Sequence, residues 1–197
     1  MDLGLILGII NGGSGMSFSD VTSSDWFFED VAAAYQLGLM NGVSAYEFAP
    51  KAPLSRAMVA ALLYRMAGSP AAYYGGRQFT DVADGKWYSS AIRWASQMGI
   101  VTGFQDGSFR PNENVTRVQL AAMLFRFAQH QSRDIRARGD LNSYQDGSSV
   151  QAWAKEAMQW AVAKGLISGK SGARLDPSGS ATRAEAATVL VRFLRQS

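Results

Sequence analysis

The chain has 197 residues, of which 47% are hydrophobic and 18% are charged, a composition typical of a globular protein that buries a core. Its net charge of +3 is too small for a dedicated nucleic-acid-binding protein, although this slight basicity suits an anionic partner. Cysteine is absent, which excludes disulfides and thiolate metal sites.

Residues 1–16 differ in character from the rest of the chain. The stretch from Leu3 to Ile10 is apolar but too short to cross a membrane, and Asp2 stands where a signal peptide would carry Lys or Arg. We interpret residues 1–16 as a fused apolar peptide followed by a Gly/Ser linker; the alternative is a natural segment that docks on an apolar groove. Neither interpretation supplies an export signal or membrane insertion, so a location outside the cell would require a signal that this chain lacks.

The remainder of the chain contains one sequence pattern three times, with the same spacing in each copy. Internal repeats of this kind indicate the fold more strongly than any other feature of a sequence. In each copy an Arg follows a Trp by thirty residues, with two glycines and a proline at fixed positions between them. Another Arg follows nine residues later. We predict three repeats, at 17–70, 78–130 and 141–197.

Each repeat is predicted to form a helix, a loop and a second helix. A glycine is placed to end the first helix of each repeat, because glycine readily adopts the left-handed conformation that closes a helix. The second helices are predicted at about 55–67, 116–129 and 182–195. Neither helix of a repeat can hide its apolar face alone, so the repeats should share a core in an all-α fold.

The second helix of repeat 2 has a distinct start. Thr116 occupies the N-cap position and Gln119 stands three residues later, which predicts a capping box. Arg117 then falls on the first helical position, where the positive end of the helix dipole disfavours a cation. A cation at a position that the helix dipole disfavours, beside free backbone N–H groups of the helix start, indicates a binding site for an anion.

Three motifs resemble those of S-layer homology (SLH) domains, which occur in three tandem copies on bacterial surface proteins. The motifs are Phe18-Ser19-Asp20-Val21, the run from Asp106 to Pro111, and Thr182-Arg183-Ala184-Glu185. The resemblance covers about residues 18–195. Repeats 1 and 2 depart from it by placing Met58 and Gln119 where repeat 3 has the acidic Glu185, and repeat 3 lacks the Phe-x-Asp-Val opening. These departures predict that one or more of the three grooves is weakened.

The resemblance implies a pseudo-threefold, three-pronged spindle around a central three-helix bundle, with grooves between neighbouring repeats. It also implies a non-catalytic carbohydrate-binding module that anchors an attached protein to the bacterial cell wall. Its partner would be secondary cell wall polysaccharide bearing pyruvylated N-acetylmannosamine. We therefore expect an extracellular, cell-surface location and a monomer that carries all three repeats, with no nucleic-acid partner and no cofactor.

The resemblance assigns the pyruvate carboxylate to the arginine that starts each second helix. A guanidinium offers a planar fork that fits a carboxylate. The alternative is that each arginine pairs with a carboxylate of the protein itself. The three candidates are Arg56, Arg117 and Arg183.

Three further sets complete the predicted ligand-binding residues, each with a structural alternative. The aspartates could accept hydrogen bonds from sugar hydroxyls, or they could cap a turn. The tryptophans could form an apolar wall for a sugar ring, or they could anchor a helix in the core. The glycines could let the backbone approach the ligand, or they could end a helix. The sets are Asp20, Asp81 and Asp146; Trp26, Trp87 and Trp153; Gly38, Gly99 and Gly165.

The residue inventory argues against catalysis. His130 is the single histidine and has no counterpart in the other repeats, which leaves a Ser or Cys nucleophile without a base and excludes metal sites built on His or Cys. The only carboxylates that share a register, Glu29 and Glu156, lie where a first helical turn favours Glu anyway. We expect no catalytic residue and no metal. The main alternative function is a protein-interaction or self-assembly scaffold built from degenerate repeats.

Overall fold

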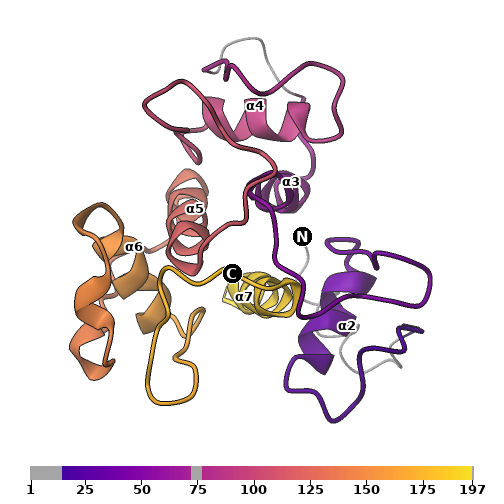
Figure 1. Cartoon of the computed structure of the whole chain (residues 1–197), viewed down its shortest axis with the longest axis vertical. Helices are drawn as coiled ribbons and strands as arrows, with labels where there is room; N and C mark the ends of the chain where they lie inside the picture. The colour runs from indigo at the N-terminus through magenta and orange to yellow at the C-terminus, as the bar shows by residue number, and fades with distance from the viewer. Residues whose placement is uncertain (1–14, 72–76, 197) are drawn as a thin grey trace. The chain divides into compact units, whose positions relative to one another are not determined.

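The computed structural model describes residues 15–71 and 77–196, and within them the fold is all-α, as predicted. Two short 3-10 turns, η1 (Leu141–Ser143) and η2 (Gly147–Ser149), precede α6, and strand-like pairing in the described part is limited to isolated bridges. No described helix is long and apolar enough to cross a membrane. The helices in Figure 1 are α2 (Phe28–Gln36), α3 (Arg56–Met66), α4 (Ser89–Gln97), α5 (Arg117–His130), α6 (Ala152–Ala163) and α7 (Arg183–Arg195).

The second helix of each repeat begins at the predicted position. In α5, the Thr116 side chain accepts the Gln119 backbone N–H, and the Gln119 side chain accepts the Thr116 backbone N–H, which confirms the capping box. The same box starts α7. At α3, Ser55 accepts the backbone N–H of Met58, whose apolar side chain cannot return a bond.

The first helix of each repeat ends at the predicted glycine. In α4, Gly99 has φ +69°, its N–H donates to the carbonyl of Ser96 at 3.1 Å, and the Ile100 N–H reaches back to Ala95 at 2.8 Å. This pair of bonds is a Schellman motif, which satisfies carbonyls that the helix end leaves open. The equivalent bonds form at Gly38 and Gly165, so the helix-ending role of all three glycines is confirmed.

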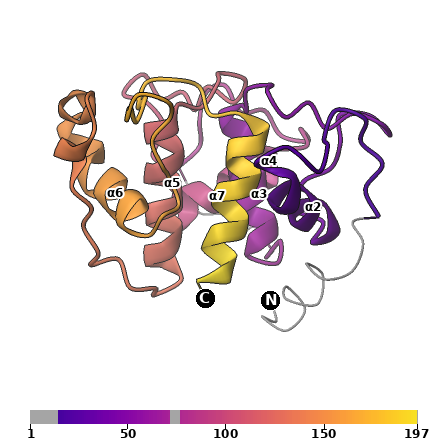
Figure 2. The ribbon, with the colours of Figure 1, turned by 90° about the horizontal axis from the view of Figure 1, so that it is seen from below.

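The chain divides into two compact units, and the first is discontinuous in sequence. It comprises the described residues up to Pro53 together with those from Ala181, so that both ends of the repeat region contribute to it. Within this unit α2 packs on α7, as Figure 2 shows. Their contact includes an ion pair of 3.1 Å between Asp30, which is buried, and Arg195.

The second unit, Leu54–Ser180, contains α3, α4, α5 and α6. Here α4 packs on α3, α6 packs on α5, and α3 also contacts α5. Aromatic rings join both pairs, with Tyr64 and Trp94 at 5.5 Å and Phe125 and Trp160 at 5.5 Å between ring centroids. Each first helix in this unit therefore packs on the second helix of the preceding repeat, which confirms that a repeat does not bury its apolar face alone.

Two predictions about the architecture stay predictions. The first is the three-pronged spindle, which stays a prediction because it depends on how the two units are placed relative to each other. The interpretation of residues 1–16 as a fused peptide with a linker falls, except for Gly15 and Met16, outside the described residues.

Candidate functional site

The three predicted arginines are buried, and each joins its helix to the loop of a different repeat. In every case the guanidinium Nε donates to a loop carbonyl oxygen. The pairs are Arg56 to Phe109 (2.8 Å), Arg117 to Leu175 (2.8 Å) and Arg183 to Phe48 (2.7 Å). The arginines thus have a structural role that the sequence analysis did not assign.

The terminal nitrogens distinguish Arg56 from the other two arginines. Nη2 of Arg117 donates to the Ser168 carbonyl at 2.8 Å, and Nη2 of Arg183 donates to the Asn41 carbonyl at 2.6 Å. The terminal nitrogens of Arg56, by contrast, have no hydrogen-bond partner among residues 15–71 and 77–196. The planar fork that can hold a carboxylate is therefore open at Arg56.

Arg56 keeps its charge without an ion pair. Neither Arg56 nor Arg183 forms a salt bridge with a carboxylate in the described part of the chain, so the alternative of pairing with the protein's own acids is wrong for both. Burial lowers the pKa of Arg56, and the charge of Glu113 partly offsets this effect. An arginine so placed stays protonated at neutral pH, because the guanidinium group is too strong a base to lose its proton in a protein. Its guanidinium carbon lies 4.8 Å from the centre of the Phe104 ring, which adds a cation–π contact.

The prediction that free backbone N–H groups accompany these arginines is wrong. At α5 the N–H of Arg117 donates to the Gly179 carbonyl at 2.9 Å, that of Val118 donates to Pro177 at 3.0 Å, and that of Gln119 donates to the Thr116 hydroxyl. The first three amides of α3 and α7 are satisfied in the same manner. Loop carbonyls from another repeat take the first two donors and the N-cap hydroxyl takes the third, so an anion at this position would have to be bound by side chains.

The predicted aspartates clamp the loop that precedes each second helix. Both carboxylate oxygens of Asp81 accept backbone N–H groups, from Phe109 and Arg110, at 2.7 Å each. Arg110 adopts a left-handed φ of +60° immediately before Pro111, a conformation that costs about 1–2 kcal/mol and that the clamp holds in place. Asp20 and Asp146 clamp Phe48–Ala49 and Leu175–Asp176 in the same way. A role for these aspartates in binding sugar hydroxyls stays a prediction.

The predicted tryptophans are exposed, with 66% of Trp26, 63% of Trp87 and 54% of Trp153 accessible. The alternative in which they anchor helices in the core is therefore wrong. Trp153 is also oriented, because its indole N–H donates to the side-chain oxygen of Gln151 at 2.6 Å. An exposed and fixed indole face offers a flat apolar surface to a sugar ring.

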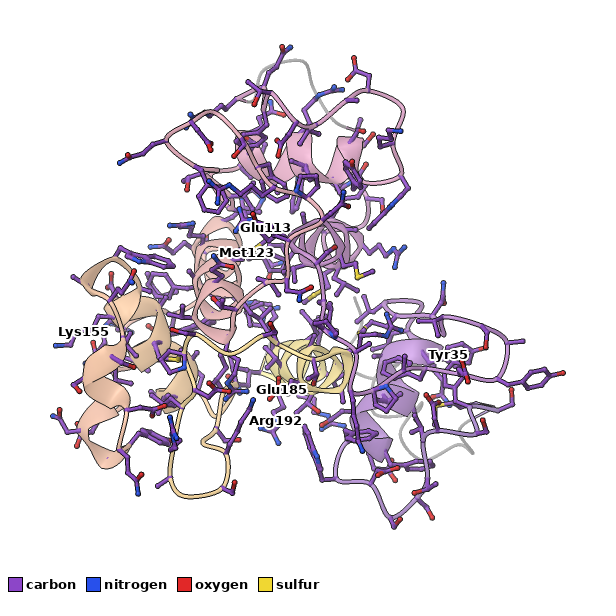
Figure 3. All side chains as sticks on the ribbon, viewed as in Figure 1. Tyr35, Glu113, Met123, Lys155, Glu185 and Arg192 are labelled. Carbon is purple, nitrogen blue, oxygen red and sulfur yellow. The ribbon has the colours of Figure 1, made fainter. Side chains whose placement is uncertain are left out.

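A groove of about 470 Å³ in the second unit brings two of the predicted residues together, Arg56 and Trp153. Among the residues that line it none is acidic, and two are cations, Arg56 and Arg126. Met123, labelled in Figure 3, lies on α5 and is one of the residues that line this groove. The lining comprises Arg56, Val101, Thr102, Gly103, Phe104, Gln119, Ala122, Met123, Arg126, Gln151 and Trp153.

Sequence reasoning missed several of these residues, and Arg126 is the most informative. Its guanidinium has no hydrogen-bond or ion-pair partner among the described residues, and burial lowers its pKa. The signal was present, since an arginine recurs nine residues after the first one in each repeat. Gln119 was recognised only for its capping box, and nothing in the sequence marked Phe104 or Gln151.

A second cavity of the same unit has a different electrostatic character. It measures about 250 Å³ and includes an ion pair between Arg93 and Asp84, which neutralises both side chains. Arg77, also in its lining, donates to the carbonyls of Thr102 (3.2 Å) and Phe104 (3.3 Å) and thereby supports the loop behind the first groove. No described cluster of His, Asp or Glu could hold a metal ion.

Comparison with known proteins identifies the family. The S-layer homology domain matches residues 17–58, 78–121 and 143–187, which together make up more than half of the chain. The chain therefore belongs to the S-layer homology domain family. Its repeats are of a non-catalytic class that anchors proteins to the cell wall.

Relatives carry this region as a small part of much longer chains. An endoglucanase of Bacillus sp. (strain KSM-635) is 31% identical over 90% of this chain and 18% of its own length. The surface-layer 125 kDa protein of Lysinibacillus sphaericus is 30% identical, over 84% of this chain and 14% of its own. A cellulosome-anchoring protein of Acetivibrio thermocellus is 25% identical, over 80% and 35% respectively. The chain thus spans about a third or less of these three relatives.

Proposed function

We propose that this chain anchors an attached protein at the bacterial cell surface by binding secondary cell wall polysaccharide. The ligand is a sugar that carries a carboxylate, of the pyruvylated N-acetylmannosamine type. The chain acts as a monomer, and the anchored protein belongs to the longer polypeptide that such a module serves. The names of the relatives, which include surface-layer and anchoring proteins, support attachment to the cell wall in general.

The observation that carries the proposal is the chemistry of the groove beside Arg56. Arg56 presents an open guanidinium fork, Arg126 adds a second cation that has no partner in the described part of the chain, and the lining contains no carboxylate. An anion that enters this groove replaces water around two partly buried cations, where charge-assisted hydrogen bonds are strongest. Trp153 at the same groove supplies the apolar face that sugar rings stack on.

Co-sedimentation with isolated wall polymer tests this function. We expect the intact chain to pellet with native polymer and to remain in solution when the pyruvate has been removed chemically. Trp153→Ala should weaken pelleting about tenfold, because it removes the stacking surface from an exposed position without disturbing the core. Tyr46→Ala is the matched control, since Tyr46 is an exposed aromatic residue outside the groove.

Arg56 needs a milder change, because its Nε supports the loop through Phe109. Arg56→Lys keeps the charge but loses the fork, and we expect it to weaken pelleting while circular dichroism and thermal unfolding verify the fold. Equal pelleting of native and pyruvate-free polymer would contradict the proposed ligand. Light scattering on the same samples addresses the scaffold alternative, which predicts a defined oligomer that ignores the polymer.

A further inference from the structure

The terminal nitrogens of Arg117 and Arg183 are held by the carbonyls of equivalent residues. Nη2 of Arg117 donates to Ser168 at 2.8 Å, and Nη2 of Arg183 donates to Asn41 at 2.6 Å. Ser168 and Asn41 each stand fifteen residues after the tryptophan of their repeat, and the same position in repeat 2 is Thr102. Repeat 2 therefore also has a carbonyl that could close the fork of its partner arginine.

A different arginine already occupies the Thr102 carbonyl. Nη1 of Arg77 donates to it at 3.2 Å, and Nη2 of Arg77 donates to the Phe104 carbonyl at 3.3 Å. Arg56 approaches the same loop, since its Nε donates to the Phe109 carbonyl at 2.8 Å. A carbonyl oxygen has two lone pairs, but a second guanidinium at Thr102 would bring two positive charges together on one atom. Arg77 thus keeps Arg56 from the acceptor that its two counterparts use.

The arginine that takes this carbonyl occurs in repeat 2 alone. Arg77 stands two residues before Phe79, whose ring lies against a glycine of its repeat. Rings that lie against a glycine in the same way stand two residues after Met16 in repeat 1 and two residues after Asn142 in repeat 3. Neither of these side chains carries a positive charge. The one loop with an arginine at this position is thus the loop whose partner arginine keeps an open fork.

Contacts on both sides of the loop hold this arrangement in place. The backbone carbonyl of Arg77 accepts the Ser96 hydroxyl at 3.3 Å, and its guanidinium carbon lies 5.9 Å from the centre of the Phe79 ring. The Phe104 ring, which lines the groove, lies 4.8 Å from the guanidinium carbon of Arg56. It offers Arg56 a cation–π contact in place of the hydrogen bond that Arg77 has taken.

We propose that Arg77 is a positioning residue for the ligand site: by occupying the Thr102 carbonyl, it leaves the terminal nitrogens of Arg56 free to bind the ligand's carboxylate. This inference rests on the proposed function. Without Arg77, Arg56 would donate to Thr102, and a carboxylate would have to displace that bond before it could use both terminal nitrogens. The affinity for an acidic sugar falls in proportion to the fraction of molecules whose fork is open. Arg77 therefore sets the strength of binding, although it is not among the residues that line the groove.

A crystal structure of the full chain with Arg77→Met, without ligand, tests the structural step. Methionine removes both donors and keeps an unbranched stem. We predict a terminal nitrogen of Arg56 at about 2.9 Å from the Thr102 carbonyl oxygen. The midpoint of thermal unfolding should stay within about 4 °C of the wild type, because only two exposed hydrogen bonds are lost. An Arg56 side chain that keeps its wild-type position would refute the inference.

Binding is measured with the methyl glycoside of pyruvylated N-acetylmannosamine and with the methyl ester of its carboxylate. The ¹⁵N–¹H signal of the Trp153 indole follows the titration, because Trp153 lines the groove. Arg77→Met should weaken binding of the acid about tenfold and change the affinity for the ester less than about twofold. Lys86→Met is the matched control, since it removes a positive charge from another exposed position of repeat 2 outside the groove. It should change the affinity for the acid less than about twofold.

A double-mutant cycle shows whether Arg77 acts through Arg56. In an Arg56→Lys background no fork remains to be closed, so adding Arg77→Met should change the affinity for the acid less than about twofold. An undiminished loss in that background would mean that Arg77 acts through its own charge or through the shape of the loop. That result would overturn the inference.

The outcomes also separate this inference from the function on which it rests. If the wild type binds the acid, Arg56→Lys weakens binding and Arg77→Met binds like the wild type, the role of Arg77 is refuted and the proposed function stands. If the wild type shifts the Trp153 signal equally with the acid and the ester, or with neither, the proposed function fails. The ligand role of Arg77 then fails with it, even where Arg77→Met closes the fork in the crystal.

Discussion

Arg56 supports the fold and also lines the proposed ligand site, and its nitrogens divide these tasks. Nε supports the loop through the Phe109 carbonyl, while the terminal nitrogens remain open to the groove. The unfavourable position of an arginine at the first residue of a helix was visible in the sequence. Its cause was not, because the carbonyl that Nε meets lies more than fifty residues away in the chain.

Asp146 carries a pH dependence of stability that can be measured. Burial alone would raise the pKa of this carboxyl, but backbone N–H bonds from Leu175 and Asp176 outweigh burial and lower its pKa. The ionised carboxylate therefore stabilises the folded state at pH values above its unfolded-state pKa of about 3.9, and this contribution is lost as pH falls through the lower folded-state pKa.

We predict that Asp146→Asn unfolds more easily at pH 7, by about 2 kcal/mol, because an amide turns one NH₂ group towards a backbone N–H donor. The variant should also lose less stability than the wild type as pH falls below about 4. Urea unfolding at a series of pH values measures both effects. Parallel stability curves for the two proteins would show that the ionised clamp does not stabilise this loop.

At the scale of elements, each repeat has two glycines four residues apart, and glycine is required at these two positions for different physical reasons. Gly99 closes α4, and a Cβ at this position would meet open space. A Cβ on Gly103 would lie 2.3 Å from Cε1 of the Phe79 ring and 2.7 Å from the Ser108 carbonyl oxygen. The same close approach occurs between Gly42 and the Phe18 ring and between Gly169 and the Tyr144 ring. Tyr144 thus fills in repeat 3 the place of Phe18 and Phe79, although the opening motif there looked degenerate.

These contacts predict that the same substitution, Gly to Ala, lowers the free energy of unfolding by different amounts at the two positions. Gly99→Ala should cost about 1 kcal/mol, since only the left-handed backbone is strained. Gly103→Ala should cost about 3 kcal/mol or more, since the same strain adds to overpacking against Phe79. Chemical denaturation of the two variants in parallel provides the measurement. Equal losses of stability would mean that the ring beneath Gly103 gives way freely.

The helix boundaries were predictable because their causes are local. Thr116, Gln119 and Gly99 act within a few residues of the helix ends that they define. The partners of the first amides of α5 were not predictable, because Gly179 and Pro177 belong to a loop of the next repeat. The expectation of free backbone N–H groups at the start of α5 was wrong for this reason, and the arginine that lines the groove is the equivalent residue of α3, Arg56.

At the scale of the whole molecule, the repeat in sequence is not the unit of packing. In the second unit α4 packs on α3 and α6 on α5, and in the first unit α2 packs on α7. Periodicity identifies equivalent positions in the three copies, but it carries no information on which helices meet. It therefore predicted the arginines and tryptophans as separate sets and could not place Arg56 with Trp153 in one groove.

The central claim is that this groove binds a carboxylate-bearing sugar through its side chains. A crystal structure of the intact chain with the methyl glycoside of pyruvylated N-acetylmannosamine tests it most directly. We predict the pyruvate carboxylate within hydrogen-bonding distance of the Arg56 terminal nitrogens, with the sugar ring against Trp153. Sugar bound only elsewhere on the chain, or bound here with its carboxylate directed away from Arg56 and Arg126, would contradict the account.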